Sequence, residues 1–295
     1  MSTTKHTFVY RTATVPIELD VYLPTTPSSS AQGLPILVWF HGGGLLQGSR
    51  KEVAPHHIRG VTKHGYVFIS VDYRLAPQVG VSDILEDVKD SLKWIATELP
   101  TKLEGGDKLL DTTRIAVSGS SAGGYLALLA GLYSTEPRPK VILPIYPITN
   151  PFGKFFTTPQ PHPFGHLERS VVESVLDLNA PVVTSDNGPE DPRSKFYPYM
   201  MQEANLAQLL HVKESGDEFV IAPQVRKRGS YLPTFIVHGD ADRFVGVEQS
   251  DEVVDALKEV GAEIEYERPN GQDHFLDVPE NVELDGYYAF LKKHV

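Results

Sequence analysis

The fold is decided by the stretch Arg114-Ile-Ala-Val-Ser-Gly-Ser-Ser-Ala-Gly-Gly-Tyr125. A short apolar run opens it, glycines and serines form its middle, and residues 122–133 continue as a segment that is apolar nearly all round. An apolar run without alternation is typical of a strand buried on both faces, and an all-round apolar segment is typical of a buried helix. The stretch therefore predicts a buried strand, a tight turn and a buried helix in direct succession.

The turn contains one Gly-x-Ser-x-Gly pattern, formed by Gly119, Ser121 and Gly123. Ser120 does not fit the pattern, because a serine precedes it by two positions. A strand-to-helix elbow forces its central residue into strained backbone angles, and glycines two positions away on each side avoid steric collision. The hydroxyl then stands beside a helix N-terminus, where a developing negative charge is stabilised. We predict that Ser121 is a nucleophile; the alternative is a plain tight turn.

Similar apolar runs lie on both sides of this stretch, and helical patterns separate several of them. The strand-like runs cover residues 35–40, 66–71, 114–117, 140–146, 234–237 and 264–267, with further strand-like sequence over 8–23. The helical patterns cover residues 83–99, 122–133, 247–260 and 286–294. Strands that alternate with helices predict an α/β fold with a mostly parallel sheet covered by helices on both faces.

One long stretch interrupts this alternation after the fourth buried run. Residues 150–232 are rich in proline and contain two helix-like pieces, 167–178 and 200–210. A stretch this long inside a compact domain is usually a lid or an inserted subdomain. We therefore expect residues 1–149 and 233–295 to form one core and residues 150–232 to form an inserted lid or cap. Its aromatic and sulfur-containing side chains contact either a ligand or each other, and the candidates for ligand contact are Phe155, Tyr199 and Met201.

The composition excludes several classes of protein. The 295 residues are 41% hydrophobic and 22% charged, as in ordinary globular proteins, and the net charge is −11. An acidic chain repels phosphate, so we expect no nucleic-acid partner and no anionic membrane partner. The absence of cysteine excludes disulfides, thiolate metal sites and a cysteine nucleophile. The first residues resemble no signal peptide and the longest clean apolar run, 36–40, is short, so we expect a cytoplasmic protein.

A glycine loop follows the first buried strand, in His41-Gly-Gly-Gly44. It is either a merely flexible loop or one whose backbone N–H groups point at a ligand because no Cβ interferes. Attack on an acyl carbon creates an oxyanion that needs two or three such donors. Gly43 and Gly44, together with the N–H of Ala122, are the candidates for this oxyanion hole, and His41 is expected to shape the loop.

A nucleophilic serine needs a base and an acid, and the ends of the last two strands offer both. His274 lies in the loop after the last strand, and Asp242 lies in Gly239-Asp-Ala-Asp242 after the preceding strand. The chain order is therefore Ser121, Asp242, His274, which is the order of α/β-hydrolases. Asp240 is the alternative acid, although an aspartate there can instead serve the turn.

The other histidines lack this position at a strand end. We expect His238 to be structural and most of the remainder to be exposed to solvent, namely His56, His57, His64, His162, His166 and His211. Pro163 breaks helical pairing of His162 with His166, and no His-Glu-x-x-His motif occurs, so no metal site is predicted.

These motifs together resemble the hormone-sensitive-lipase-like carboxylesterase family of α/β-hydrolases. They are His41-Gly-Gly-Gly44, Asp72-Tyr-Arg-Leu-Ala-Pro77, Gly119-x-Ser-Ala-Gly-Gly124 and the loops of Asp242 and His274. The resemblance is strongest over residues 35–149. It implies an α/β-hydrolase fold, a catalytic triad of Ser121, Asp242 and His274, and a supporting role for residues 72–77 beneath the oxyanion loop.

Three features depart from that family. Ser120 stands where the residue before the nucleophile is usually Asp or Glu, and Gln78 stands where Glu often follows the proline. Strand-like sequence begins near Phe8 and leaves no room for the family's usual helical N-terminal cap. Residues 150–232 would then supply most of the lid.

The resemblance implies a serine hydrolase that cleaves carboxylic esters through an acyl-enzyme, without a cofactor. The aromatic side chains of residues 150–232 favour small substrates with an apolar or aromatic group. A lactone, an amide or another acyl-transfer substrate would use the same residues. A non-catalytic binding protein on the same fold is the alternative of another class, since fold alone does not imply function. The intact set of Ser121, Asp242 and His274 favours an enzyme. The sequence does not indicate the oligomeric state.

Overall fold

The computed structural model describes residues 2–25, 32–186, 188–213 and 216–295. Residues 24–33 are rich in proline, serine and threonine, which predicts a loop, and residues 26–31 of this stretch lie outside the described ranges. The described residues form one eight-stranded sheet with the strand order β1-β2-β4-β3-β5-β6-β7-β8. β1 and β2, and β2 and β4, pair antiparallel, whereas all the other pairs are parallel. The predicted mostly parallel sheet is confirmed.

The strands are β1 (Thr3–Thr12), β2 (Pro16–Pro24), β3 (Leu34–Phe40), β4 (Val67–Val71), β5 (Leu110–Ser120), β6 (Val141–Ile145), β7 (Thr234–Val237) and β8 (Ile264–Glu267). The α-helices are α1 (Pro55–Gly60), α2 (Val81–Thr97), α3 (Leu99–Lys102), α4 (Gly106–Leu109), α5 (Ala122–Tyr133), α6 (Glu173–Leu176), α7 (Phe196–Glu203), α8 (Leu206–Leu209), α9 (Ile221–Arg228), α10 (Glu248–Glu259) and α11 (Asp285–His294). Shorter helical turns are η1 (Val61–Gly65), η2 (Lys154–Thr157), η3 (Arg169–Val171) and η4 (Pro192–Lys195).

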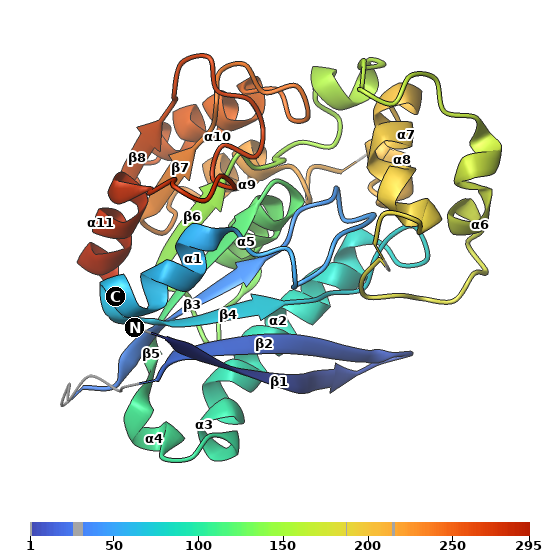
Figure 1. The fold of residues 1–295 in the computed structure, drawn as a ribbon. Coiled ribbons are helices and arrows are strands. Elements are labelled where there is room, and N and C mark those ends of the chain that lie inside the picture. The colour runs from blue at the N-terminus through green and yellow to red at the C-terminus, as the bar shows by residue number, and fades with distance from the viewer. Residues whose placement is uncertain (1, 26–31, 187, 214–215) are drawn as a thin grey trace.

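Helices cover both faces of the sheet, as its apolar strands require (Figure 1). Every residue of β4, β6 and β7 is buried, because each of these strands has a neighbour on both sides and a helical layer on both faces. One hydrophobic cluster joins the sheet to α2, α5, α9 and α10. A second cluster joins the opposite face to η1 and α11. The core therefore consists of two apolar layers with the sheet between them.

The N-terminal strand-like sequence forms a hairpin. Residues 8–23, which read as one strand-like stretch, belong to β1 and β2, which pair in register apart from a bulge between Val9 and Arg11. β2 then pairs antiparallel with β4, so the hairpin extends the parallel sheet at one edge. Tyr10 anchors the hairpin, because its hydroxyl donates a 2.9 Å hydrogen bond to the carbonyl oxygen of Asp72, just after β4.

Residues 150–232 contain less regular helix than the sequence predicts. Only η3 and the four residues of α6 form within 167–178, and the predicted helix over 200–210 is divided between α7 and α8. The division lies at Ala204, whose φ of 53° ends α7. Periodicity placed helices correctly in the core but not here, because the chain is held by individual contacts to loops rather than by one continuous apolar face.

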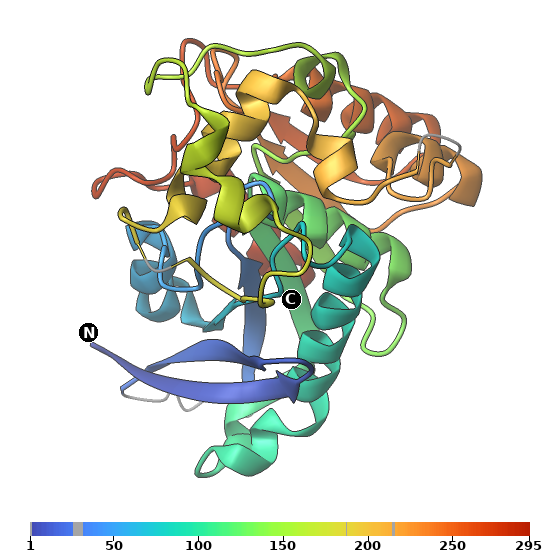
Figure 2. The ribbon, with the colours of Figure 1, turned by 90° about the vertical axis from the view of Figure 1, so that its right-hand side faces the viewer.

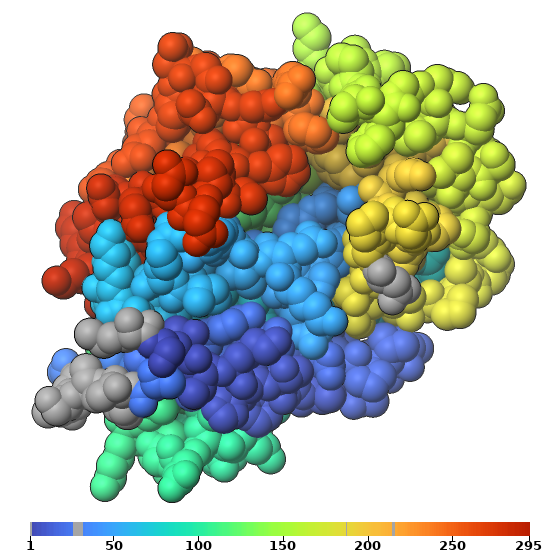
Figure 3. Space-filling view, viewed as in Figure 1, coloured from blue at the N-terminus to red at the C-terminus, as the bar shows by residue number. Residues whose placement is uncertain are grey.

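Most of this segment gathers at one end of the sheet, around α6, α7 and α8 (Figures 1 and 2). The space-filling view shows these residues on one side and the C-terminal residues on the other, with the residues that follow β3 between them (Figure 3). α9 differs from the rest of the segment, because it packs against α5 and α10 in the helical layer of the core.

Candidate active site

Ser121 lies in the sharp turn between β5 and α5, with φ 58° and ψ −118°. Such angles cost a non-glycine residue about 1–3 kcal/mol and are found mostly at functional sites. The flanking glycines permit the turn, since a Cβ on Gly119 would lie 2.2 Å from Gly123 and a Cβ on Gly123 would lie 1.9 Å from the carbonyl oxygen of Phe40. The Gly-x-Ser-x-Gly spacing is therefore a packing requirement of this elbow.

The glycine loop after β3 lies beside the elbow. Gly43 and Gly44 have φ values of 97° and 69°, which favour glycine. Within the described part of the chain, the backbone N–H groups of Gly43, Gly44 and Ala122 donate to no protein acceptor. Gly43 lines the cavity in front of Ser121, whereas Gly44 packs under the ring of Tyr197, where a Cβ would meet a ring carbon at 2.3 Å.

The segment Asp72–Pro77 packs against the loop after β3 and donates hydrogen bonds to it. The hydroxyl of Tyr73 donates to the carbonyl oxygen of His41 at 2.8 Å, and its ring stacks on the His41 ring with 4.2 Å between centroids. The backbone N–H of Ala76 donates to the carbonyl oxygen of Leu45 at 2.8 Å. His41 is fully buried, which lowers the pKa of its imidazole although Asp72 acts in the opposite sense. Its neighbours hold it within the loop.

Asp242 and His274 are brought together by the loops after β7 and β8. Asp242 Oδ2 lies 2.6 Å from His274 Nδ1. Its other oxygen, Oδ1, accepts hydrogen bonds from the backbone N–H groups of Phe244 at 2.8 Å and Val245 at 2.9 Å, so the carboxylate cannot rotate freely. Burial alone would raise the pKa of Asp242. Hydrogen bonds from His238, His274 and the Val245 N–H outweigh that effect and hold the pKa well below the usual aspartate value.

The alternative acid, Asp240, has a different set of contacts. Its Oδ1 accepts a 2.6 Å hydrogen bond from the backbone N–H of Gly271, and its own N–H donates to the carbonyl oxygen of Pro269. These bonds join the loop after β7 to the loop after β8. No hydrogen bond between Asp240 and His274 occurs in the described ranges.

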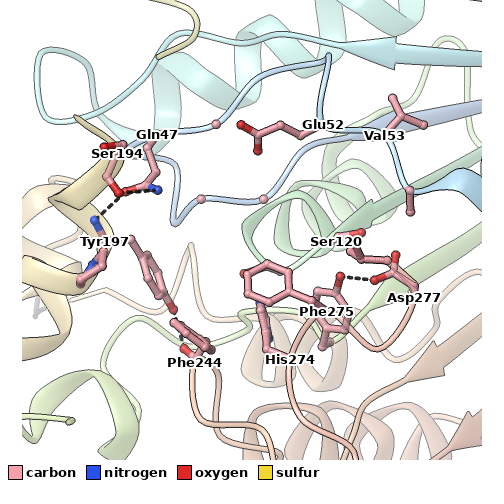
Figure 4. Close-up of a pocket in the computed structure, with 18 of the residues that line it drawn as sticks. Gln47, Glu52, Val53, Ser120, Ser194, Tyr197, Phe244, His274, Phe275 and Asp277 are labelled. Atoms are coloured by element: carbon pink, nitrogen blue, oxygen red, sulfur yellow. Dashed lines mark hydrogen bonds between the residues drawn. The ribbon is translucent and has the colours of Figure 1, made fainter. Parts of the chain in front are cut away.

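His274 and Ser121 line one cavity of about 550 Å³. Phe244 and Phe275 lie beside the imidazole, with ring centroids 5.6 and 4.6 Å from it (Figure 4). The ring centroid of Tyr146 lies 4.2 Å from that of the imidazole. No hydrogen bond joins the serine hydroxyl to the imidazole among the residues described. Such bonds are often long before substrate binds and shorten in the reacting complex.

The cavity wall is mostly apolar. The apolar and aromatic residues that line it are Trp39, Val53, Ala54, Tyr146, Pro163, Phe164, Tyr197, Pro198, Phe244, Phe275 and Val278. Four of these come from residues 150–232, but Phe155, Tyr199 and Met201 are not among them. Tyr199 and Met201 are buried in the core cluster and Phe155 packs against it. Sequence identifies the apolar residues of α7 but not the rotation of the helix, which turns Tyr197 and Pro198 toward the cavity.

Two residues that the sequence did not single out connect residues 150–232 to the oxyanion loop. Arg193 is buried and donates to the carbonyl oxygens of Leu46 at 2.8 Å and Ala76 at 2.9 Å. Burial lowers the pKa of this guanidinium to about 10. Gln47 accepts a 2.9 Å hydrogen bond from the backbone N–H of Tyr197 (Figure 4).

A polar cluster in the cavity wall was also missed. The Tyr146 hydroxyl donates to Asp277 Oδ1, and Ser120 Oγ accepts from Trp39 Nε1 at 3.3 Å. Asp277 Oδ2 lies 3.5 Å from His56 Nε2. The sequence could not place Asp277, because nothing local distinguishes it from the other acidic residues of the C-terminal region.

His56 and His57 are fully buried, and only His166 and His211 of the six histidines are exposed, so the prediction that most of the six are exposed was wrong. The short helix α1 presses them against the sheet, where the His57 ring stacks on Phe68 with 4.8 Å between centroids. The ligand atoms of His56, His57 and Asp277 lie within 4.8 Å of one another, and this is the metal-compatible group that the described residues contain. His56 Nδ1 and Asp277 Oδ1 are already engaged by Tyr288 and Tyr146.

The remaining histidines differ in exposure. His166 and His211 are exposed as predicted, whereas His64 and His162 are partly buried. His238 is fully buried and bonds to Ser250 Oγ at 2.7 Å through Nδ1.

Curated relatives match nearly the whole chain. A non-reducing polyketide synthase from Preussia isomera is 30% identical over 96% of this chain, and one from Emericella nidulans is 28% identical over 95% of it. The matched regions make up only 14% and 13% of those two proteins. The chain therefore corresponds to about one seventh of the length of these relatives.

Solved structures share the fold. An α/β-hydrolase superfamily protein from Enterococcus faecalis has a TM-score of 0.73 at 20% identity, covering 98% of this chain and 97% of that one. Carboxyl esterase 2 from Tuber melanosporum has a TM-score of 0.66 at 20% identity, covering 100% of this chain and 89% of that one. The predicted α/β-hydrolase fold is confirmed. Among the described helices, none has the length and apolar character needed to span a bilayer.

A family model agrees with this fold. The model described as BD-FAE matches residues 19–257, which include the oxyanion loop, the elbow and Asp242. The chain therefore belongs to the BD-FAE family.

Proposed function

We propose that this protein is a serine hydrolase that cleaves carboxylic esters through an acyl-enzyme. Ser121 Oγ attacks the acyl carbon while His274 takes its proton, and the imidazolium then protonates the departing alkoxide. Asp242 keeps the Nδ1–H tautomer of His274 and stabilises its charged form. The N–H groups of Gly43, Gly44 and Ala122 stabilise the oxyanion, and water then releases the acid in the reverse sequence of proton transfers. No cofactor takes part.

One observation carries the proposal. Asp242 and His274 form a fixed pair, with 2.6 Å between Oδ2 and Nδ1. His274 lines the same cavity as Ser121, whose backbone φ is 58°. Three loops far apart in the chain must converge for this arrangement, which an ordinary tight turn would not require. The unpartnered N–H groups nearby supply donors where charge would develop.

The cavity supports an apolar or aromatic substrate. Its wall is largely hydrophobic, and the rings of Phe164 and Phe275 are about half exposed, at 55% and 53%. Exposed rings at a cavity mouth are positioned to cover apolar groups of a ligand. We assign to residues 150–232 the role of a lid, in which Pro163, Phe164, Tyr197 and Pro198 contact the substrate.

A second candidate function is the cleavage of an aromatic acyl thioester. The observation that favours it is that the chain matches, over nearly its full length, a segment of non-reducing polyketide synthases. A thioester would use the same nucleophile, base and oxyanion donors, since only the leaving group changes. Lactone or amide cleavage has no observation that favours it over the ester.

The test is a substrate panel for wild-type protein and Ser121→Ala. The panel contains p-nitrophenyl esters of increasing acyl length, aryl esters, N-acetylcysteamine thioesters, lactones and amides. We expect turnover of aryl or short acyl esters by the wild type and a loss of at least about 10³-fold in Ser121→Ala. Preference for aromatic thioesters over matched oxygen esters would establish the second candidate. Saturable ligand binding without turnover of any substrate would indicate a non-catalytic binding protein.

A further inference from the structure

The cavity wall contains a carboxyl group that the proposed reaction does not use. Glu52 lies between the oxyanion loop and α1, and its side chain lines the cavity (Figure 4). In the view of Figure 4, the carboxyl is directed toward the side of the cavity where Gln47 and Ser194 lie. Within the described ranges, this carboxyl makes no hydrogen bond and no ion pair. It is therefore an acceptor available to a ligand.

The formally charged side chains in the described part of the cavity wall are acidic. Glu52 and Asp277 line it, and no lysine or arginine does so among the residues described. Asp277 is 1% exposed and accepts a hydrogen bond from Tyr146, so it is already engaged within the protein. Glu52 is exposed as a residue, although protein surrounds much of its carboxyl, and within the described ranges this carboxyl is unpaired. It is thus the acid that a ligand in this cavity would meet first.

Among the described residues near Glu52, no positively charged side chain pairs with its carboxylate. The negative charges of Asp186 and Asp72 repel a negative charge on Glu52. The charge of Glu52 in turn acts on the buried hydroxyl of Tyr73. The nearby Arg50 is bound to Asp72 and Glu18, and Arg193 is bound to backbone carbonyl oxygens. His41 lies 3.9 Å from Asp72 and is buried away from the cavity. Loss of water around the carboxyl, followed by the charges of Asp186 and Asp72, raises the pKa of Glu52 to about 7.

We propose that Glu52 is a specificity-determining residue that selects esters carrying an ammonium group. The ammonium would donate a charge-assisted hydrogen bond to the Glu52 carboxylate while the ester carbonyl lies at Ser121. This inference rests on the proposed hydrolase function and names a substrate class for the same site. A cation would also relieve the repulsion among Glu52, Asp186 and Asp72, because no lysine or arginine among the described cavity-lining residues offsets it. Anionic esters should be poor substrates for the same reason.

The carboxyl is neutral well below pH 7 and charged well above it. Preference for a cation should therefore rise as the pH is raised through about 7. A ratio of two substrates isolates this effect, since any pH-dependent change that alters the hydrolysis of both substrates alike cancels.

The experiment compares cationic esters with isosteric neutral esters between pH 5.5 and 8.5. One pair places the charge in the alcohol, as 3-(dimethylamino)propyl and 4-methylpentyl butyrate. The other pair places it in the acyl group, as p-nitrophenyl esters of 4-(dimethylamino)butyric and 5-methylhexanoic acids. We expect the ratio of kcat/KM values, cationic over neutral, to rise about fivefold with pH in at least one pair.

Glu52→Gln should abolish this rise, because the amide keeps the shape of the side chain but not its charge. Glu104→Gln is the matched control, since it removes one charge from an exposed residue between α3 and α4, outside the cavity lining, and should keep the wild-type profile. A ratio that is flat with pH in both pairs, or a rise that persists in Glu52→Gln, would overturn the proposal while hydrolysis of the neutral esters remained intact. If no ester of either kind is hydrolysed, the hydrolase function itself fails.

Discussion

His238 Nε2 lies 3.3 Å from Asp242 Oδ2, the same oxygen that His274 Nδ1 approaches at 2.6 Å. Two histidines from different loops therefore face one carboxylate oxygen. His238 is fully buried, its Nδ1 is bonded to Ser250 Oγ at 2.7 Å, and its Nε2 also lies 3.0 Å from the carbonyl oxygen of Val245. A hydrogen on Nε2 satisfies both oxygen neighbours. His238 thus has a role beyond packing, which is to hold Asp242 in place.

The first prediction concerns that role. His238→Gln should lower kcat by about 10–100-fold with a smaller change in KM, because a hydrogen bond to a charged group is worth about 1.5–3 kcal/mol. Steady-state kinetics and a thermal melt test this together. Ser250→Ala is the control, since it leaves Nε2 in place and should keep most of the activity. Wild-type kcat in a folded His238→Gln protein would show that His274 alone fixes the carboxylate.

The second prediction distinguishes the two aspartates after β7. Asp242→Asn keeps an oxygen for the N–H groups of Phe244 and Val245 but turns an amide donor toward His274, which imposes the wrong tautomer. The turnover should fall by up to about 10⁴-fold, as in serine proteases with the same change. Asp240→Asn weakens the 2.6 Å bond from Gly271 and should lower activity only in proportion to lost stability. The assignment is reversed if Asp240→Asn abolishes turnover in folded protein while Asp242→Asn remains active.

The third prediction concerns the pH dependence of stability. The pKa of Glu52 is raised from 4.5 to about 7, so the folded protein binds this proton more tightly than the unfolded chain does. Its contribution to stability is complete below pH 4.5 and is lost as the pH rises through about 7. The Tm of Glu52→Gln minus that of the wild type should therefore increase over this range, by about 1–3 °C for an exposed group. A difference that is constant from pH 4 to 8 would contradict the raised pKa.

The fourth prediction concerns Arg193, which joins residues 150–232 to the oxyanion loop. Arg193→Met should destabilise the fold by about 2–3 kcal/mol, because the carbonyl oxygens of Leu46 and Ala76 lose their donor. It should also reduce kcat, since the loop that carries Gly43 loses a support. Val225→Ala is the control, because it creates a cavity in the buried face of α9 and should destabilise the fold to a similar extent. Equal losses of kcat in both variants would mean that Arg193 acts through stability alone.

The sequence predicted most of the fold because short-range signals agree with the tertiary structure in the core. The strand-like runs at 234–237 and 264–267 coincide with β7 and β8, and the apolar segment 122–133 coincides with α5. Periodicity works where one apolar face packs on one sheet. It failed over 167–178 and 200–210. Over 167–178 the chain is held by individual contacts, such as the hydrogen bonds from Gln78 Nε2 to the carbonyl oxygens of Val175 and Asp177.

The residues of the site were harder to predict from the sequence than the fold was. Ser121, Asp242 and His274 could be selected because each follows a strand, and the structure brings all three to one region. His238 also follows a strand, but nothing local indicates that it reaches the same carboxylate as His274. The cavity-lining side chains Tyr197 and Glu52 depend on helix rotation and loop path, which adjacent residues do not encode. The choice of Phe155, Tyr199 and Met201 shows that limit.

The central claim is that Ser121 is the nucleophile, and covalent labelling tests it most directly. Wild-type protein is treated with a fluorophosphonate at neutral pH, digested and examined by tandem mass spectrometry. The account predicts one adduct per chain, located on Ser121, with labelling slowed strongly in His274→Ala and prevented in Ser121→Ala. An adduct on Ser118 or Ser120, or no adduct on protein that hydrolyses esters, would contradict it.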